Sequence, residues 1–178
     1  MNKRILFTGG PGTGKTTVIN KLINKGRFCF EESSREIIND FKKKGIDQLF
    51  LSNPIRFSEL LLKSRIQQFI EADKINNKCV FFDRGIPDII AYLNFKNTNY
   101  SNEFVAASND YRYDKVFIFK PWKEIYMNDY ERYESYEELV SINNHIEDCY
   151  LNLGYNLIEV PFDSAINRMK YILKQIES

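Results

Sequence analysis

Short apolar segments alternate with longer amphipathic segments along this chain, and the two kinds predict different elements. The short segments predict strands, at residues 3–8, 27–30, 79–82, 114–119 and 156–160. The amphipathic segments predict helices, at residues 17–25, 35–44, 55–77, 87–93, a short stretch ending near 109, 137–153 and 165–176. Strands that alternate with helices form a parallel sheet covered on both faces, so the pattern predicts one three-layer α/β domain over residues 1–178.

Two segments carry more detail. Residues 79–82 are continuously apolar, which is typical of a strand buried on both faces. The buried stripe of the helix over 55–77 is predicted to consist of Leu62, Ile66, Phe69 and Ile70. Ligands of parallel α/β sheets bind at the carboxyl ends of the strands, so the polar residues that follow the strands are the first candidates for chemistry.

The segment between the first strand and the first helix matches G-x-x-x-x-G-K-[ST], the phosphate-binding P-loop. It consists of Gly9, Gly10, Pro11, Gly12, Thr13, Gly14, Lys15 and Thr16. Glycines let successive N–H groups turn toward phosphate oxygens, and the following helix adds unpaired N–H groups and a positive dipole end. A glycine-rich turn without a ligand is the alternative, which the flanking strand and helix disfavour.

Roles for single residues follow from this motif. Lys15 is expected to reach the β- and γ-phosphates, and the hydroxyl of Thr16 to ligate Mg²⁺. Thr17, at the start of the helix, is included in the predicted nucleotide site.

Asp83 and Arg84 directly follow the buried strand at 79–82. P-loop enzymes place an acid at this position to hold Mg²⁺, directly or through water, whereas the alternative for Asp83 is a helix cap or a salt bridge. Arg84 would be costly to bury unpaired. We therefore expect it either to bind a substrate phosphate or to pair with Asp83 or Glu32.

Glu31 and Glu32 end the second strand, which lies close to the P-loop in sheets of this kind. Either carboxylate could accept a proton from an attacking hydroxyl group, and a solvated turn is the alternative. The sequence does not indicate which of the two points inward. On the long helix, Arg65 and Gln68 could face a second substrate.

The segment from Trp122 to Tyr136 is charged, aromatic and irregular. A flap that closes over phosphates excludes water and needs a cation such as Arg132 to offset charge in the transition state. The segment is therefore predicted to be a lid, with a surface helix and turn as the alternative.

Composition excludes several classes. The formal net charge of +1 argues against a nucleic-acid partner, which usually requires a basic face. No apolar run approaches the ~20 residues of a membrane span, and the first strand begins at Lys3, so a cytoplasmic protein without a signal peptide is expected. Cys29, Cys79 and Cys149 are odd in number, lack metal-ligand spacing and are expected to be reduced. His145 has no partner for a triad or a metal site.

Further motifs recur in a fixed order after the P-loop. They are Phe82-Asp83-Arg84-Gly85-Ile86-Pro87-Asp88, residues 111–117, Pro121-Trp122, Ile125-Tyr126, Asp129, Arg132, Gly154-Tyr155 and Val160-Pro161. Together they resemble a family of small bacterial P-loop proteins labelled an AAA domain or predicted ATPase, related to the ATP-binding domain of ribosylnicotinamide kinase. The resemblance covers nearly the whole chain.

This resemblance implies a kinase-like P-loop fold with strand order 2-3-1-4-5 and a lid after the fourth strand. It also implies ATP and Mg²⁺ as cofactors, with Lys15, Thr16 and Asp83 in the roles given above. In kinases of this shape the loop after the fifth strand often contacts adenine. Pro161 and Phe162 are the candidates for that contact, within the loop that ends at Asp163.

The leading hypothesis is an ATP-dependent phosphotransferase for a small molecule such as a nucleoside, or an ATPase. In it, Arg84 and Arg132 bind phosphate oxygens and one of the two glutamates orients the acceptor. The alternative is a nucleotide-dependent switch with slow hydrolysis, although the chain lacks the guanine-reading N-K-x-D signature. A ring ATPase is disfavoured because the chain is short and Asp83 is followed by Arg84, not by a second acid. The acceptor and the oligomeric state stay open.

Overall fold

Five parallel strands form the centre of the protein in a computed structural model that describes residues 2–43, 45–46, 49–126 and 135–177. The strands are β1 (Lys3–Thr8), β2 (Cys29–Phe30), β3 (Cys79–Asp83), β4 (Lys115–Ile118) and β5 (Leu157–Glu159). They are ordered β2-β3-β1-β4-β5, and every neighbouring pair is parallel. The predicted strand order 2-3-1-4-5 is therefore confirmed.

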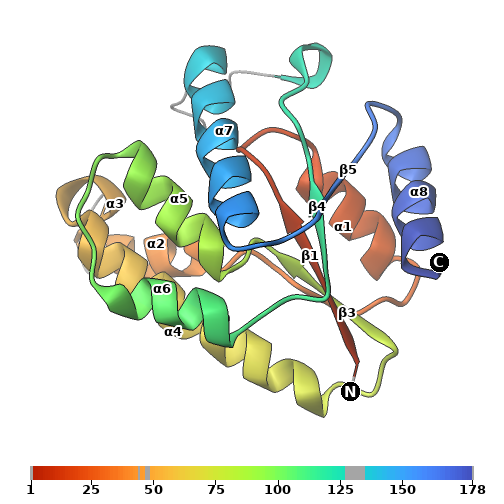
Figure 1. The fold of residues 1–178 in the computed structure, drawn as a ribbon, viewed down its shortest axis with the longest axis horizontal. Helices are drawn as coiled ribbons and strands as arrows, with labels where there is room; N and C mark the ends of the chain where they lie inside the picture. The colour runs from red at the N-terminus through yellow and green to blue at the C-terminus, as the bar shows by residue number, and fades with distance from the viewer. Residues whose placement is uncertain (1, 44, 47–48, 127–134, 178) are drawn as a thin grey trace.

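Two helical layers cover the sheet because alternate strand residues point to opposite faces. On β1, Ile5 and Phe7 pack into one core and Leu6 into the other. The first core is completed by α1 (Lys15–Ile23) and α8 (Ala165–Glu177). The second core is completed by α4 (Pro54–Glu71), α5 (Ile86–Phe95), α6 (Asn102–Asp110) and α7 (Tyr136–Asn152). Figure 1 shows these two groups of helices on opposite sides of the strands.

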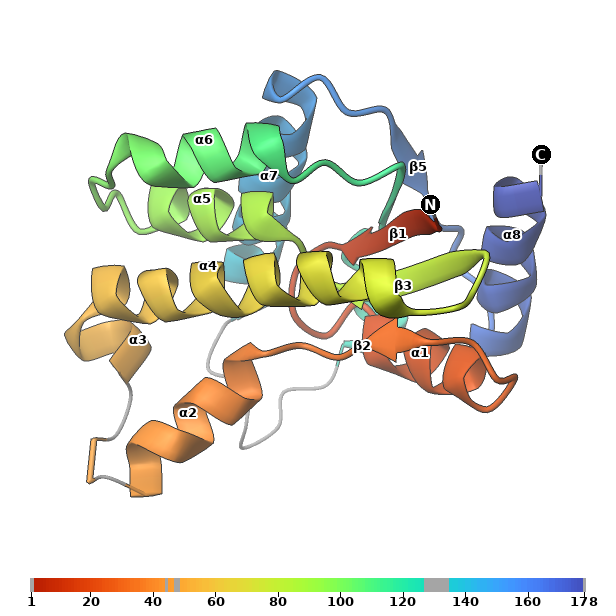
Figure 2. The ribbon, with the colours of Figure 1, turned by 90° about the horizontal axis from the view of Figure 1, so that it is seen from below.

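Shorter elements complete the chain. They are α2 (Ser34–Lys43), α3 (Leu49–Ser52) and two 3₁₀ turns, η1 (Ala72–Lys74) and η2 (Lys123–Ile125). Figure 2 shows that α2 follows β2 and extends away from the sheet, beside α4. Within the ranges given above, no helix combines the length and apolar character of a membrane span.

The long helix α4 departs from its prediction near its end. It stops at Glu71 and continues as η1, short of the predicted end at residue 77. Its Leu62 is buried as expected, but Ile70 is 45 % exposed. Because each residue turns the helix by 100°, position 70 lies about 80° around the axis from position 62, outside the apolar stripe.

Candidate active site

The P-loop is a tight turn that requires glycine at defined positions. Gly9, Gly12 and Gly14 have φ angles of 128°, 72° and 86°, in the region that favours glycine. A side chain at position 9 would also place its Cβ 2.3 Å from the carbonyl oxygen of Phe119. Gly14 is the N-cap of α1 and has no side chain to bond the first N–H groups of that helix. These N–H groups can therefore bind an anion.

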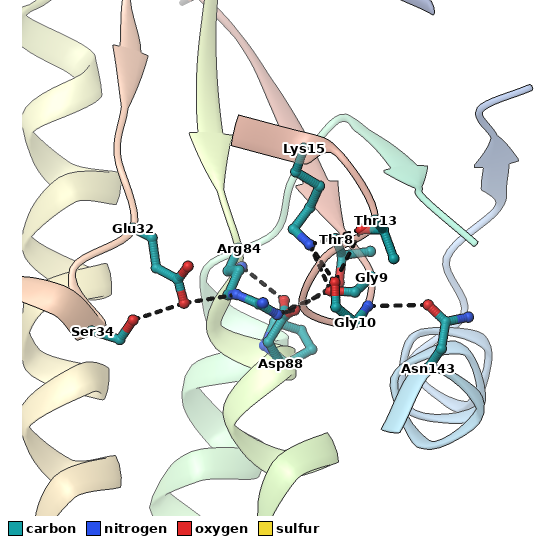
Figure 3. Close-up of polar contacts among 12 residues, drawn as sticks. Thr8, Gly9, Gly10, Thr13, Lys15, Glu32, Ser34, Arg84, Asp88 and Asn143 are labelled. Atoms are coloured by element: carbon teal, nitrogen blue, oxygen red, sulfur yellow. Dashed lines mark hydrogen bonds and ion pairs between the residues drawn. The ribbon is translucent and has the colours of Figure 1, made fainter. Parts of the chain in front are cut away.

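The loop itself holds the side chain of Lys15. The buried Nζ donates hydrogen bonds to the carbonyl oxygens of Gly9 (2.8 Å) and Gly10 (2.7 Å) and to Oγ1 of Thr13 (3.1 Å) (Figure 3). Burial, together with the nearby charge of Arg84, lowers the pKa of Lys15 to about 7. The ammonium group that the sequence predicts for phosphate binding thus lies on the inner side of the loop.

Arg84 connects the end of β3 to the P-loop and to β2. Its Nε lies 2.8 Å from Oε1 of Glu32, and its Nη1 donates to the carbonyl oxygen of Gly9 at 3.0 Å (Figure 3). Its Nη1 is also 3.6 Å from Oδ1 of Asp88. Burial opposes the charge, but Glu32 and other neighbours raise the pKa of Arg84 above its usual range. Pairing with Glu32 was one of the two predicted alternatives, and a direct phosphate contact stays a prediction.

Glu32 is the glutamate that points toward the P-loop. Its Oε1 accepts a hydrogen bond from Oγ of Ser34 (2.7 Å) besides the contact with Arg84. Burial favours the neutral acid, but Arg84 and Ser34 outweigh it and lower the pKa of Glu32 to about 2. Glu31 is exposed, and its backbone carbonyl accepts from Nε2 of Gln68 (3.1 Å).

A cavity of about 300 Å³ lies beside these groups. It is lined by Thr16, Ile19, Asn20, Cys29, Phe30, Glu31, Glu32, Glu36, Gln68 and Asp83. The P-loop, the end of β3 and both glutamates therefore meet at a single hollow. Arg65, by contrast, does not line this cavity and instead donates a hydrogen bond to the carbonyl of Gly85.

Thr16 and Asp83 fit a magnesium ion. Asp83 is 6 % exposed, and its Oδ1 has no hydrogen-bond partner among the described residues. Burial, with the charge of Glu32 next in size, raises the pKa of Asp83 to about 6. Hard oxygen donors suit Mg²⁺, which is usually held by one or two protein oxygens, waters and substrate phosphates. In the described ranges no three His, Cys, Asp or Glu side chains form a metal cluster.

Asp88 holds the elements around the P-loop together through hydrogen bonds. The sequence predicted no role for it. This fully buried carboxylate accepts hydrogen bonds from Oγ1 of Thr8 (2.7 Å), the backbone N–H of Gly85 (2.8 Å) and the hydroxyl of Tyr150 (2.5 Å). Because Thr8 ends β1 just before the P-loop, Asp88 ties the loop to α5 and α7. The sequence signal was its place in the first turn of a helix, after Pro87, where an acid caps the N-terminus.

Two further residues hold the P-loop through hydrogen bonds that no sequence motif predicted. Oδ1 of Asn143, on α7, accepts from the N–H of Gly10 at 3.1 Å (Figure 3). Arg168, on α8, is 2 % exposed, and its Nη1 donates to the carbonyl of Thr13 at 3.0 Å. Its Nε and Nη2 are buried without a hydrogen-bond partner in the part of the chain that the structure describes. A basic residue within the apolar stripe of an amphipathic helix was the only signal for it.

Aromatic rings lie beside Arg168, next to the P-loop. The guanidinium carbon of Arg168 lies 4.6 Å from the ring centroid of Phe119 and 5.9 Å from that of Trp122. Trp122 stacks on Phe162, with centroids 5.4 Å apart and planes inclined by 23°. Pro161 and Phe162 are exposed, so the predicted adenine-contacting loop lies at the rim of this cluster.

The remaining predicted residues are placed as follows. Pro11 and Gly12 are half-buried in the P-loop, and Thr17 is exposed in the first turn of α1. Arg132 and residues 127–134 of the predicted lid lie outside the described residues, which include its two ends at Trp122 and Tyr136.

The sheet order, the helical layers and the P-loop between β1 and α1 define a P-loop protein with a kinase-like fold. A family described as AAA domain matches residues 4–168. The chain belongs to this AAA-domain family, which confirms the resemblance seen in its motifs. No curated protein matches the chain.

Solved structures share the fold at low sequence identity. A deoxyadenosine kinase from M. mycoides with dCMP and dCDP bound has a TM-score of 0.73 and 16% identity, over 98% of each chain. A thymidylate kinase from Candida albicans has a TM-score of 0.67 and 16% identity, over 99% of this chain and 91% of that one. The NadR protein in complex with NR has a TM-score of 0.76 and 17% identity, over 99% of this chain and 50% of that one. This chain thus spans about half the length of NadR.

Proposed function

We propose that this protein is a Mg-ATP-dependent phosphotransferase that acts on a hydroxyl group of a small molecule. The observation that carries the proposal is the shared lining of one cavity by Thr16, Asp83 and Glu32. The phosphate-binding end of α1, a candidate metal ligand and a carboxylate for the acceptor thereby face the same space. The likeness in fold to deoxyadenosine kinase, thymidylate kinase and NR-bound NadR supports a small-molecule acceptor.

The P-loop and α1 bind the phosphates of ATP in this proposal. N–H groups of the loop and of the first turn of α1 surround the phosphate oxygens. Lys15 exchanges its contacts with the carbonyls of Gly9 and Gly10 for oxygens of the β- and γ-phosphates. Thr16 and Asp83 would hold Mg²⁺, and the ion would supply positive charge that offsets the negative charge developing on the phosphates.

Glu32 orients the acceptor hydroxyl. With a pKa of about 2 it is ionised at neutral pH, so it accepts a hydrogen bond but is a weak base. Weak basicity is compatible with phosphoryl transfer, since a loose transition state requires positioning and charge stabilisation more than proton removal. Arg84 fixes Glu32 in place, and Arg132 is proposed to add positive charge from the lid.

The test is ADP production from Mg-ATP, measured alone and with a panel of nucleosides and nucleoside monophosphates, with GTP in a parallel series. Lys15→Ala is the control for contaminating activity. Large stimulation by one acceptor, with the phosphorylated product identified by mass spectrometry, is the expected result. Slow turnover that no acceptor changes would overturn the phosphotransferase proposal and favour a nucleotide-dependent switch.

A further inference from the structure

The cavity beside the P-loop is strongly acidic. Four of its ten lining residues are carboxylates, namely Glu31, Glu32, Glu36 and Asp83, and none of the ten is Lys, Arg or His. Sites built for a phosphate normally present Arg or Lys side chains toward it. The charge of this lining therefore bears directly on which acceptor the cavity can hold.

Two of these four carboxylates have no ion pair among the side chains that the structure describes. Arg84 pairs with Glu32, but no ion pair joins Glu31 or Glu36 to a cationic side chain that the structure describes. Both of these carboxylates are exposed and lie at the outer part of the lining, on and just before α2.

A buried oxygen of Asp83, the atom that would hold Mg²⁺, indicates that the cavity takes a ligand. Asp83 is 6 % exposed, lines the cavity, and has an Oδ1 without a hydrogen-bond partner in the described ranges. Buried polar atoms are rarely left unpartnered, so an external partner is expected here. The amide groups of Asn20 and Gln68 line the same space.

We propose that the acceptor is an unphosphorylated hydroxyl compound that is neutral or positively charged, such as a nucleoside, and not a nucleoside monophosphate. This inference rests on the phosphotransferase function proposed above. The phosphate of a nucleoside monophosphate would bring a dianion close to Glu31 and Glu36, where like charges oppose binding. The volume of about 300 Å³ lies at the small end of ligand cavities, which suits a molecule of nucleoside size.

The rest of the lining is compatible with such a compound. Phe30 and Ile19 supply apolar surface, and the amides of Asn20 and Gln68 supply donors and acceptors for a neutral polar molecule. A cationic ring gains additional attraction from the carboxylates of Glu31 and Glu36. The expected order of preference is therefore cationic nucleoside, neutral nucleoside, nucleoside monophosphate.

Matched acceptor pairs test this order with the full chain and Mg-ATP. The pairs are adenosine with AMP, thymidine with TMP, and the cationic nicotinamide riboside with its 5′-monophosphate. We expect kcat/KM for at least one nucleoside to exceed that of its monophosphate by tenfold or more. Equal or faster phosphorylation of the monophosphates would overturn this inference while leaving the phosphotransferase function intact. If Mg-ATP binds in calorimetry but no acceptor is phosphorylated, both proposals fall.

Charge variants test the cause of the preference. Glu36→Gln should reduce the selectivity for the cationic over the neutral nucleoside by about two- to fivefold, as expected for one exposed carboxylate. Glu36→Lys should reduce it further and raise kcat/KM for the monophosphates. The matched control is Glu103→Gln, which removes an exposed carboxylate from α6, outside the cavity lining. Selectivity that changes equally in the Glu103 and Glu36 variants would contradict the inference.

Discussion

Nε of Arg84 lies 2.8 Å from Oε1 of Glu32, and this pair joins the carboxyl ends of β3 and β2 beside the P-loop. Arg84 has a φ of 69°, a left-handed conformation that is unusual for a residue with a side chain. Such conformations cost about 1–3 kcal/mol and persist where surrounding contacts enforce them. Here the enforcing contacts are the ion pair and the bond from Nη1 to the carbonyl of Gly9. The left-handed backbone conformation of Arg84 therefore places its guanidinium group beside Glu32 and the P-loop.

Replacing Glu32 by Gln should lower the free energy of unfolding by about 3 kcal/mol at pH 7, because the pKa of Glu32 falls from 4.5 to about 2 on folding. A lowered carboxyl pKa stabilises the fold above the unfolded value, and the contribution is lost as pH falls through the folded value. The difference between wild type and variant should hence shrink between about pH 4.5 and pH 2. Urea denaturation at several pH values measures it.

Glu31→Gln is the matched control, since the neighbouring Glu31 is exposed and has no ion pair with a described side chain. Its effect on the free energy of unfolding should stay within about 0.5 kcal/mol. Equal effects of the two substitutions would show that the pair with Arg84 does not stabilise the fold.

The P-loop could be predicted from sequence because its signals are local, whereas the strand order was implied only by the resemblance to a known family. Gly9 to Thr16 is contiguous, and its flanking strand and helix have clear periodicity. The choice between Glu31 and Glu32 could not be predicted, because β2 pairs over only Cys29 and Phe30 and the chain turns directly afterwards. Without a longer strand, the alternation of side chains gives no fixed inward position.

The residues that support the loop were missed for a different reason. Asp88, Asn143 and Arg168 reach Thr8, Gly10 and Thr13 from helices 80 or more residues away in sequence. Such contacts depend on how α5, α7 and α8 pack against the sheet, which periodicity alone does not specify. The remaining sequence signal for such residues is a polar side chain on an apolar helix face, and it does not indicate which residue the side chain contacts.

Replacing Lys15 by Ala should reduce acceptor phosphorylation by about 10²–10³-fold, because a contact to developing phosphate charge contributes about 3–4 kcal/mol. Nucleotide affinity should also fall, as measured by calorimetry with Mg-ATP. Lys21→Ala removes an exposed lysine from the last turn of the same helix and serves as control. Turnover in Lys15→Ala equal to that of the Lys21 variant would exclude the proposed role of Lys15.

Replacing Asp88 by Asn should destabilise the protein by about 3 kcal/mol or more. Gly85 and Tyr150 both donate to Oδ2, so an asparagine can keep its amide oxygen at that position. Its amide nitrogen then replaces Oδ1, which accepts from Oγ1 of Thr8 and lies 3.6 Å from Nη1 of Arg84, and the buried negative charge opposite Arg84 is lost. Tyr150→Phe removes only one of these donors and should cost about 1 kcal/mol. Chemical denaturation compares the two. An Asn variant as stable as the Phe variant would mean that the carboxylate charge is not needed.

Replacing Arg168 by Met should weaken nucleotide binding about tenfold, because the contact that holds the carbonyl of Thr13 is lost. The Arg168→Met substitution should destabilise the fold less than Arg168→Lys.

The reason is the buried charge of Arg168. Burial lowers the pKa of Arg168, and two of its nitrogens have no hydrogen-bond partner in the described chain, so its charge is poorly compensated. Methionine removes that charge and keeps apolar volume, whereas a lysine ammonium is more strongly hydrated and costs more to bury. Calorimetric titration and urea denaturation of both variants measure the two effects, and a Lys variant more stable than the Met variant would refute the argument.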